Sequence, residues 1–526
     1  MAESFERKWF MCDYARERVF VRDEFVMWLD ALKGLGYNGL GMYLEGAYDF
    51  ECIPGVIREG VITREDAKWI LAEGKKRGIY VFPMTNVVGH MEHFFRQERF
   101  SDMMMDGYDM QMDFRREGAE EFVMRIVREL CEAFECRMIH IGGDETRLTE
   151  DTKMLYAEFL ARICKNLLNE GVQPAIWDDM IWMDPEMCDV FDRRTFIFDW
   201  NYYGHRPESI QHFKKLGFSD IIVCPCDNSW ENFITHQHLS GHLKAHTDIP
   251  VQPDEVEAFL EDARLGGLPH GLLTNWNNET GRNMWAQWTT FARAGLYMDG
   301  RLEARERNDT LIETALFGRV TPYTELTYDI QNQIQGDDHY RQWYGPMRSM
   351  LFSADAVLRI YGYLRADPAA DFFSGYLTTA DQLENKLNEW TPEGQFEINC
   401  YTAMAATIEM IRAAACITKA LDSNKLYRRA ADVQFDSPEA AAVMLGRVAG
   451  GFRTAAEAVR TAAAVHAEAI KSTGHTKFDL VRMRDISDKL DETAGIVDKY
   501  SETCARIPLP RFDMILGQAF GGKMII

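Results

Sequence analysis

The stretch "MIHIGGDET", residues 138–146, joins a short apolar run to two glycines and two adjacent acids. Apolar residues that alternate over a few positions indicate a β-strand. Two glycines directly after a strand let the backbone turn tightly and come close to a ligand. The like charges of Asp144 and Glu145 repel each other at such a place unless solvent, a cation or a function stabilises them. The stretch therefore predicts a strand that ends in a functional acid pair.

Similar apolar runs lie on both sides of this strand, and amphipathic helical segments separate them. One such segment, "TREDAKWILAEGKKRG" at 63–78, opens with the capping-box pattern from Thr63 to Asp66. The strand candidates are residues 9–15, 39–44, 79–85, 138–142, 174–177, 195–200, 220–225 and 271–276. Strands that alternate with helices over roughly 250 to 300 residues predict a TIM (β/α)8 barrel in the α/β class, with a doubly wound parallel sheet as the weaker alternative.

The rhythm changes at about residue 302, where long Ala-rich helical patterns such as "YTAMAATIEMIRAAACITKAL" replace the strand-like runs. We therefore predict a catalytic barrel over 1–301 and an all-helical C-terminal domain over 302–526. Ala-rich helices pack closely, so this domain is expected to brace the barrel or to form a homodimer surface rather than to take part in catalysis.

Composition narrows the class of protein. The chain has 526 residues, 46% of them hydrophobic, which is enough for a large core in more than one domain. Its formal charge of −24, with no block of Lys or Arg, disfavours nucleic-acid and anionic-membrane partners. No run of 18 apolar residues occurs and the N-terminus is charged, so a cytoplasmic location is expected. The 11 cysteines show no framework spacing, which predicts free thiols.

Polar and aromatic residues gather where the predicted strands end, which is where a TIM barrel places its chemistry. They are Arg16, Glu45, Asn86, His90, Asp144, Glu145, Trp177, Asp178, Asp179, Asp199, Trp200, Tyr202, Tyr203, Asp227, Trp230, Trp276 and Glu279. Exposed tryptophans are costly unless they face a partner, and the apolar faces of sugar rings stack on indole rings. Carboxylates mixed with tryptophans therefore predict a carbohydrate site.

These residues also carry a family resemblance. "HIGGDE" at 140–145 resembles the His-x-Gly-Gly-Asp-Glu signature of glycoside hydrolase family 20, the β-N-acetylhexosaminidases. "DYARERVF" at 13–20 resembles the first-strand arginine segment of that family, and "RGIYVFPMTNVVGHMEH" at 77–93 resembles its third-strand segment. The resemblance covers about residues 8–300 and is closest to compact members with a helical C-terminal region.

The resemblance implies an exo-acting enzyme that removes terminal β-linked N-acetylglucosamine or N-acetylgalactosamine, without a cofactor or metal. Glu145 would be the general acid and base, Asp144 would orient the 2-acetamido group, and Arg16 would hold sugar hydroxyls. The remaining implied sugar contacts and supporting residues are Glu45, His90, His140, Trp177, Trp200, Tyr202, Tyr203, Trp230, Trp276 and Glu279, with Tyr202 or Tyr203 bonded to the acetamido carbonyl.

The adjacency of the two acids has a mechanistic meaning. Retaining glycosidases ordinarily place an acid and a nucleophile on opposite sides of the scissile bond. Consecutive residues cannot easily straddle a sugar ring, so the acetamide oxygen of the substrate is the expected nucleophile, and Asp144 would stabilise the resulting oxazolinium. We also expect an ionised Asp144 to raise the pKa of Glu145 and so to favour the acid form.

Three alternatives stay open. A conventional retaining glycosidase would take its nucleophile from Asp178, Asp179, Asp227 or Glu279. A metal-dependent hydrolase is suggested by His238, His242 and His246, which repeat at helical spacing in "THQHLSGHLKAH", but no glutamate is interleaved and a surface row explains them. A sugar-binding protein without catalysis is disfavoured by the intact acid pair. The Met-rich segment 101–114 is read as packing under the barrel rim, or as an adaptable lip over the site.

Overall fold

The structure is a computed structural model of the chain. It describes residues 4–16, 18–55, 60–95, 97–202, 204–227, 255–276, 283–303, 306–330, 333, 349–366, 374–475 and 477–521. The chain divides into two compact units, Met1–Trp230 with Asp248–Asn278 and Thr289–Arg319, and Glu231–Thr247 with Glu279–Trp288 and Val320–Ile526. We call them the barrel unit and the helical unit. The domain boundary placed at 301 and 302 stays a prediction.

The barrel unit is built on a closed parallel barrel. Its strands are β1 (Arg7–Asp13), β2 (Gly39–Tyr43), β3 (Tyr80–Met84), β6 (Met138–His140), β7 (Gln173–Trp177), β8 (Phe196–Trp200), β9 (Ile221–Cys224) and β10 (His270–Asn275). They follow the order β1-β10-β9-β8-β7-β6-β3-β2, and every pair is parallel. Closure confirms the TIM barrel and excludes the doubly wound sheet. Each predicted strand coincides with one of these.

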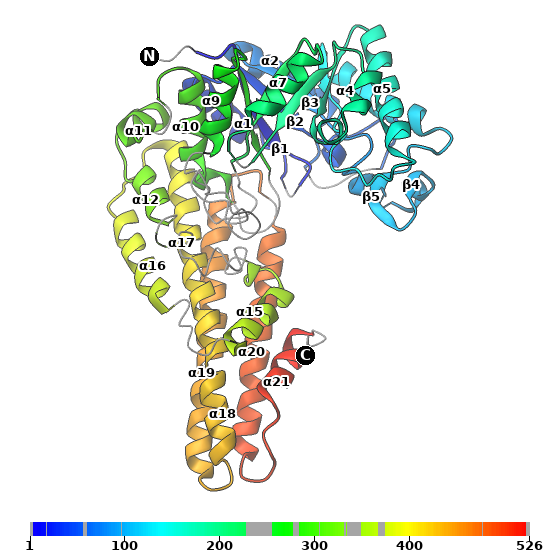
Figure 1. The fold of residues 1–526 in the computed structure, drawn as a ribbon. Helices are drawn as coiled ribbons and strands as arrows, with labels where there is room; N and C mark the ends of the chain where they lie inside the picture. The colour runs from blue at the N-terminus through cyan, green and yellow to red at the C-terminus, as the bar shows by residue number, and fades with distance from the viewer. Residues whose placement is uncertain are drawn as a thin grey trace. The chain divides into compact units, whose positions relative to one another are not determined.

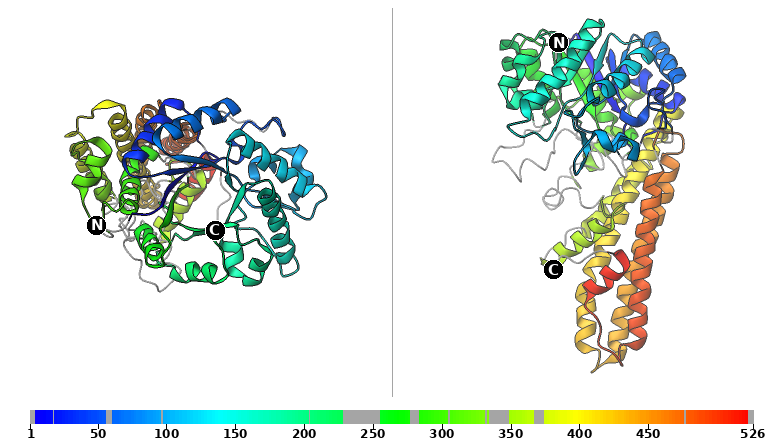
Figure 2. Two further views of the ribbon diagram at one scale, coloured as in Figure 1. Left: turned by 90° about the horizontal axis from the view of Figure 1, so that it is seen from above. Right: turned by 90° about the vertical axis from the view of Figure 1, so that its right-hand side faces the viewer.

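Helices surround the strands (Figure 2, left). The longer ones are α1 (Arg22–Gly34), α2 (Arg64–Arg77), α4 (Ala119–Ala133), α5 (Lys153–Asn169), α7 (Pro207–Lys215), α9 (Glu255–Leu265), α10 (Trp288–Met298) and α11 (Asp309–Phe317). The predicted capping box at the start of α2 is present, because Thr63 accepts from the backbone of Asp66 and Asp66 accepts from the backbone of Thr63. Short helical turns follow several strand ends: η1 (Glu45–Ala47), α3 (Glu92–Phe95), η2 (Glu98–Met103), α6 (Asp179–Met183) and η3 (Pro185–Val190).

The Met-rich segment contains a hairpin that the sequence did not predict. Strands β4 (Met104–Met105) and β5 (Tyr108–Met112) pair in antiparallel fashion. Gly107 in its turn has a φ of 71°, a conformation that glycine adopts without strain. Met112 is buried, whereas Met103, Met104, Met105 and Met110 are partly exposed. The segment is therefore partly packed against the protein and partly exposed to solvent.

Aromatic side chains fill the barrel interior beneath the strand ends. The buried cluster contains Trp9, Met11, Tyr43, Phe82, Met84, Met138, Trp177, Phe196, Phe198, Ile222, Leu272 and Trp276, among others. The rings of Trp9 and Phe82 lie 5.0 Å apart between centroids, and those of Phe196 and Phe198 lie 4.9 Å apart. This packed interior forms a rigid floor below the site.

The helical unit consists of helices in every element that the structure describes there. They are η4 (Met284–Ala286), α12 (Tyr323–Ile330), α15 (Ala354–Ala366), α16 (Ser374–Leu387), α17 (Gly394–Asp422), α18 (Asn424–Val433), α19 (Pro438–Ala469), α20 (Phe478–Thr503) and α21 (Phe512–Phe520). The long helices α17, α19 and α20 pack side by side (Figure 1). Alanines on the buried face of α19, such as Ala449, Ala456 and Ala462, allow this close approach. The predicted helical C-terminal region is confirmed.

One helical stretch of the described chain, Gly394–Val433, is long and apolar enough to cross a membrane. Its most apolar 18-residue window has a mean hydropathy of 1.2, and 67% of that window is buried inside the protein. Burial of this extent is typical of the core helix of a bundle, so length and composition are weak evidence for a membrane span here.

Candidate active site

A cavity of about 180 Å³ lies at the carboxyl ends of the barrel strands. The described residues that line it are Arg16, His90, Asp144, Glu145, Trp177, Trp200, Tyr202 and Trp276. Each of them was among the residues predicted from the strand ends. They follow six different strands of the barrel, so closure of the sheet brings them together.

The backbone after β6 explains why two glycines precede the acid pair. Gly142 and Gly143 have φ values of 73° and 100°, where residues with a Cβ are strained. A Cβ on Gly142 would lie 1.7 Å from Oδ1 of Asn86, and one on Gly143 would lie 2.8 Å from Leu160. Only glycine fits at position 142, and the turn it permits aims Asp144 and Glu145 at the cavity.

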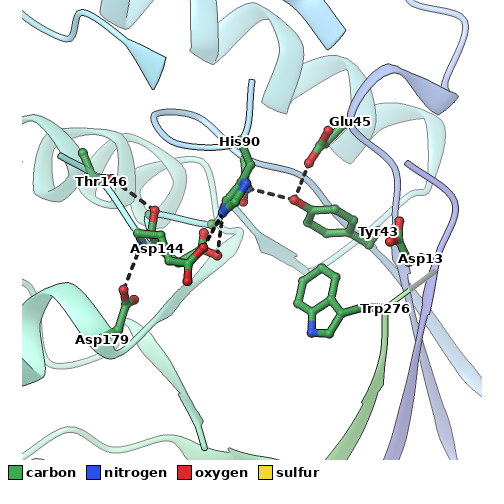
Figure 3. Close-up of polar contacts among 12 residues, drawn as sticks. Asp13, Tyr43, Glu45, His90, Asp144, Thr146, Asp179 and Trp276 are labelled. Atoms are coloured by element: carbon green, nitrogen blue, oxygen red, sulfur yellow. Dashed lines mark hydrogen bonds and ion pairs between the residues drawn. The ribbon is translucent and has the colours of Figure 1, made fainter. Parts of the chain in front are cut away.

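One nitrogen of His90 faces both acids, and Figure 3 shows its ring beside Asp144. Its Nε2 is 3.1 Å from Oε2 of Glu145 and 3.6 Å from Oδ2 of Asp144. Burial disfavours the charged ring, but the carboxylates of Asp144 and Glu145 outweigh burial and raise the pKa of His90 to about 9. At neutral pH a cationic imidazolium therefore contacts both carboxyl groups and donates to Glu145.

The two acids have opposite pKa shifts. Burial raises the pKa of Asp144, whose side chain is 12% exposed. The hydrogen bond from His90 lowers the pKa of Glu145, whose side chain is 60% exposed. The expectation that the pKa of Glu145 is raised is therefore wrong for this structure, because the hydrogen bond and charge of His90, with the charge of Arg16, outweigh the effect of burial.

The residues after β7 fix the acid pair from below. The backbone N–H of Glu145 donates to Oδ2 of Asp179 over 2.9 Å, and burial followed by the charge of Asp144 raises the pKa of Asp179 to about 8. Asp178 is fully buried; it accepts from the backbone of Trp200 over 2.8 Å and pairs with Arg206 over 3.0 Å. Both aspartates thus bind neighbouring backbone or side-chain groups. The hydrogen bond between Asp179 and Glu145 was not predicted from the sequence.

Aromatic rings and one arginine form the walls of the cavity. Trp177 and Trp276 have centroids 6.0 Å apart, and Nε1 of Trp276 donates to the hydroxyl of Tyr202 over 2.7 Å. Trp200 packs against Tyr202 with centroids 4.7 Å apart. The guanidinium of Arg16 lies 5.3 Å from the ring centroid of Trp276 and 3.1 Å from Oδ2 of Asp13. A cavity with indole walls, one guanidinium and two acids suits a sugar with polar substituents.

Comparison with known proteins agrees with this chemistry. Residues 42–248 match the family model described as glycosyl hydrolase family 20, catalytic domain. This part of the chain is therefore similar to the catalytic domain of glycoside hydrolase family 20. No curated protein matches the sequence significantly.

Solved structures of family 20 enzymes resemble the chain remotely. The β-N-acetylhexosaminidase from Bacteroides fragilis NCTC 9343 is 18% identical, and the match covers 58% of this chain and 68% of that one with a TM-score of 0.45. The GH20 β-N-acetylhexosaminidase from Streptomyces coelicolor A3(2) is 16% identical, with coverages of 59% and 67% and a TM-score of 0.45. The Streptomyces plicatus N-acetyl-β-hexosaminidase is 17% identical, with coverages of 61% and 68% and a TM-score of 0.45.

Two predicted site residues of the barrel lie behind the cavity and are not among the described residues that line it. His140 is fully buried; its Nδ1 accepts from the backbone N–H of Gly142 over 3.2 Å, and its ring packs on Trp177. Burial keeps the pKa of His140 well below its usual value, so the ring is neutral. It therefore supports the turn that carries the acids.

Glu45 is the second residue behind the cavity. It is fully buried and accepts a hydrogen bond from the hydroxyl of Tyr43, and burial raises its pKa to about 8. Tyr43 was missed by sequence reasoning, although it faces Trp276 edge-on at 5.0 Å and accepts from Asn86 over 2.8 Å. Tyr43 is the last residue of β2 and lies on the inward face of the strand. This position could have identified it from the sequence.

Several predicted residues fall outside the described residues. These are Tyr203, Trp230 and Glu279 of the proposed sugar site, and His238, His242 and His246 of the alternative metal site. Of the two tyrosines considered for the acetamido carbonyl, Tyr202 is the one that the structure places on the cavity. The roles of all of these residues stay predictions.

Groups that could hold a metal ion occur at three places in the described residues. In the barrel unit they are His90 with Asp144 and Glu145, and Glu45 with Glu92 and His93. In the first group His90 contacts both acids, and in the second His93 forms an ion pair with Glu45 at 3.6 Å. The third group lies in the helical unit.

Proposed function

We propose that this cavity removes terminal β-linked N-acetylhexosamine residues with the acetamide of the substrate as nucleophile, and that Glu145 and Asp144 are its catalytic residues. The observation that carries the proposal is the position of the acids. Among the described residues that line the cavity, they are the only carboxylates, and one imidazolium contacts both. No lining carboxylate in the described part of the chain stands across the cavity to attack the anomeric carbon.

Glu145 is suited to the proton transfers. Its exposed carboxyl faces the open side of the cavity, where a leaving oxygen would lie. A bound sugar would cover Glu145 and remove water from it, which raises its pKa toward the value that a general acid needs. In this proposal His90 passes from Glu145 toward Asp144 as the sugar binds, which frees the acid to donate.

Asp144 is suited to stabilise the cyclised intermediate. Its carboxyl is buried within reach of the cationic His90, which favours the ionised form against the effect of burial. A buried carboxylate stabilises the positive charge that develops on the acetamide nitrogen more strongly than an exposed one, because water does not screen it.

The structure disfavours the conventional retaining alternative at three of its four candidates. Asp178 is buried and bound to Arg206 and to the backbone of Trp200, and Asp179 holds the backbone of Glu145. Asp227 is buried and accepts from Asn275 over 2.5 Å. None of the three lines the cavity.

A panel of aryl β-glycosides with one shared leaving group tests the proposal. N-acetylglucosamine and N-acetylgalactosamine glycosides should be cleaved, and the matching glucosamine and glucose glycosides should be nearly inert. Removal of the acetamide removes the attacking atom. The loss of transition-state stabilisation should therefore exceed the roughly 1 to 3 kcal/mol of a missing binding contact, and it should appear as a lower kcat. Comparable cleavage of the glucoside, or a sugar adduct trapped on an aspartate or on Glu279, would overturn it.

Exo action is part of this proposal, and a panel of glycans that carry the N-acetylhexosamine at a terminal or an internal position tests it. The partner is accordingly a small or oligomeric glycan with a terminal β-N-acetylhexosamine. The cytoplasmic location and the homodimer through the helical unit remain proposals. Gel filtration with light scattering would test the second.

A further inference from the structure

The helical unit contains a histidine and aspartate cluster that the hydrolase chemistry does not use. His466 lies near the end of α19, His475 lies in the connection that follows, and Asp479 lies in the first turn of α20. The side chains of His466 and Asp479 are fully buried and that of His475 is 8% exposed. Potential ligand atoms of all three lie within 4.8 Å of one another. The cluster thus connects the two arms of one helical hairpin.

Both imidazoles direct Nε2 at the same carboxylate oxygen. Nε2 of His475 is 3.2 Å and Nε2 of His466 is 3.5 Å from Oδ2 of Asp479. Both Nε2 atoms are buried, and neither makes a hydrogen bond of acceptable geometry with the described residues. Buried polar nitrogens almost always have a partner, so two that face one carboxylate oxygen without a well-formed hydrogen bond are candidates to share a cation with it.

The spacing fits tetrahedral zinc. Zinc binds imidazole nitrogen at about 2.0 to 2.1 Å and carboxylate oxygen at about 2.0 to 2.2 Å, so neighbouring ligand atoms of a tetrahedron lie roughly 3.3 to 3.5 Å apart. The two observed separations, 3.2 Å and 3.5 Å, agree with this edge.

The surroundings of Asp479 are those of a ligating carboxylate. Nη1 of Arg482, one turn along α20, lies 3.6 Å from Oδ1, whereas both imidazoles face Oδ2. An outer contact of this kind orients a ligating carboxylate. Two imidazoles and one carboxylate form a nitrogen and oxygen donor set that suits zinc.

We propose that His466, His475 and Asp479 bind one Zn²⁺, with a water in the fourth position, and that this structural site joins α19 to α20. The competing explanation is that Asp479 accepts hydrogen bonds from two neutral rings without a metal. The two explanations differ in metal content and in the response of stability to zinc.

Metal content is measured first, by elemental analysis of the full chain purified without a histidine tag and dialysed. We expect one zinc per chain, and loss of that zinc in His475→Gln and in Asp479→Asn. A variant with His238→Gln, His242→Gln and His246→Gln, which removes the other histidine row of the sequence, should keep its zinc. Zinc lost from the triple variant but retained by the cluster variants, or iron at the same stoichiometry, would overturn the assignment.

Stability gives an independent readout. The chelated wild-type protein should melt several degrees lower and should recover with Zn²⁺ alone, because zinc at about 100 times its Kd shifts the folding equilibrium about 100-fold. His475→Gln, whose side chain is the closest of the three to the surface, should melt at one temperature with and without zinc. Identical melting of the chelated and zinc-treated wild-type protein would show a cluster held by hydrogen bonds alone. Should Asp479→Asn fail to fold, His475→Gln still decides both measurements.

Discussion

At the scale of single residues, the active site stores backbone strain. Glu45, His90 and Glu145 have φ values of 39°, 49° and 47°, which residues other than glycine rarely adopt. Such conformations cost on the order of 1 to 3 kcal/mol each and persist where the surroundings impose them. Each of the three belongs to the network around the acids, so the backbone at these positions is set before a sugar binds, while the side chains can still move.

Glu145→Gln should retain the fold and lose most turnover on substrates with poor leaving groups. General-acid assistance contributes roughly 10² to 10⁴-fold, and good leaving groups need less of it. Comparison of kcat/KM for a series of aryl leaving groups of different pKa checks this. The dependence on leaving-group pKa should be steeper for the variant than for the wild-type enzyme, and parallel lines would count against Glu145 as the acid.

His90→Gln should move the pH dependence as well as the rate. The pKa of His90 is raised to about 9, so the ring is cationic at neutral pH and favours the ionised form of both neighbouring acids. Loss of that cation should raise the pKa of Asp144 and of Glu145. Both limbs of the kcat/KM profile should then shift to higher pH, by roughly one unit or more.

A matched control for that shift is His212→Gln on α7, which replaces a histidine of the barrel unit that does not line the cavity. It should leave the profile in place. A fall in kcat for His90→Gln without any shift of the profile would mean that His90 acts through packing alone.

At the scale of elements, the strand ends were predictable and the contacts between them were not. The alternation in "MIHIGGDET" identified β6 and its acids, because one strand and one turn determine them. The opposite directions of the two pKa shifts depend instead on His90 from the end of β3 and on burial around Asp144. The hydrogen bond from the backbone of Glu145 to Asp179 likewise joins the loops that follow two different strands, so no local sequence pattern predicts it.

The turn after β6 supplies a test at this scale. Gly142→Ala should be inactive and clearly destabilised, since its Cβ would overlap Asn86 and its φ is 73°. Gly107→Ala in the β4–β5 turn is the matched control, because its φ is 71° and its Cβ would meet nothing within 4 Å. In the control the free energy of unfolding should fall only by the cost of the backbone conformation, about 1 kcal/mol, and the activity should be unchanged. Equal losses of Tm and of rate in Gly142→Ala and Gly107→Ala would show that the Asn86 side chain moves aside to accommodate the new Cβ.

At the scale of the whole molecule, chemistry and metal binding fall in separate units. The residues proposed for hydrolysis lie in the barrel unit, and the proposed zinc ligands lie in the helical unit. The formal charge of −24 adds a general constraint, because a surface of this charge repels anionic partners. A neutral terminal sugar meets no such barrier.

This separation predicts the effect of chelation on catalysis. Proton transfer by Glu145 and charge stabilisation by Asp144 require no metal, so a fully chelated enzyme should hydrolyse an aryl N-acetylglucosaminide at 25 °C with unchanged kcat and KM. The assay must run well below the melting transition, because metal removal is expected to lower Tm through the helical unit and partial unfolding would mimic a catalytic loss. Asp479→Asn serves as the internal control, since it removes the proposed zinc ligand and leaves every cavity residue in place. If chelation abolishes activity at this temperature and zinc restores it in the wild-type enzyme, the metal participates in hydrolysis, and the row of His238, His242 and His246 becomes the leading candidate for its ligands.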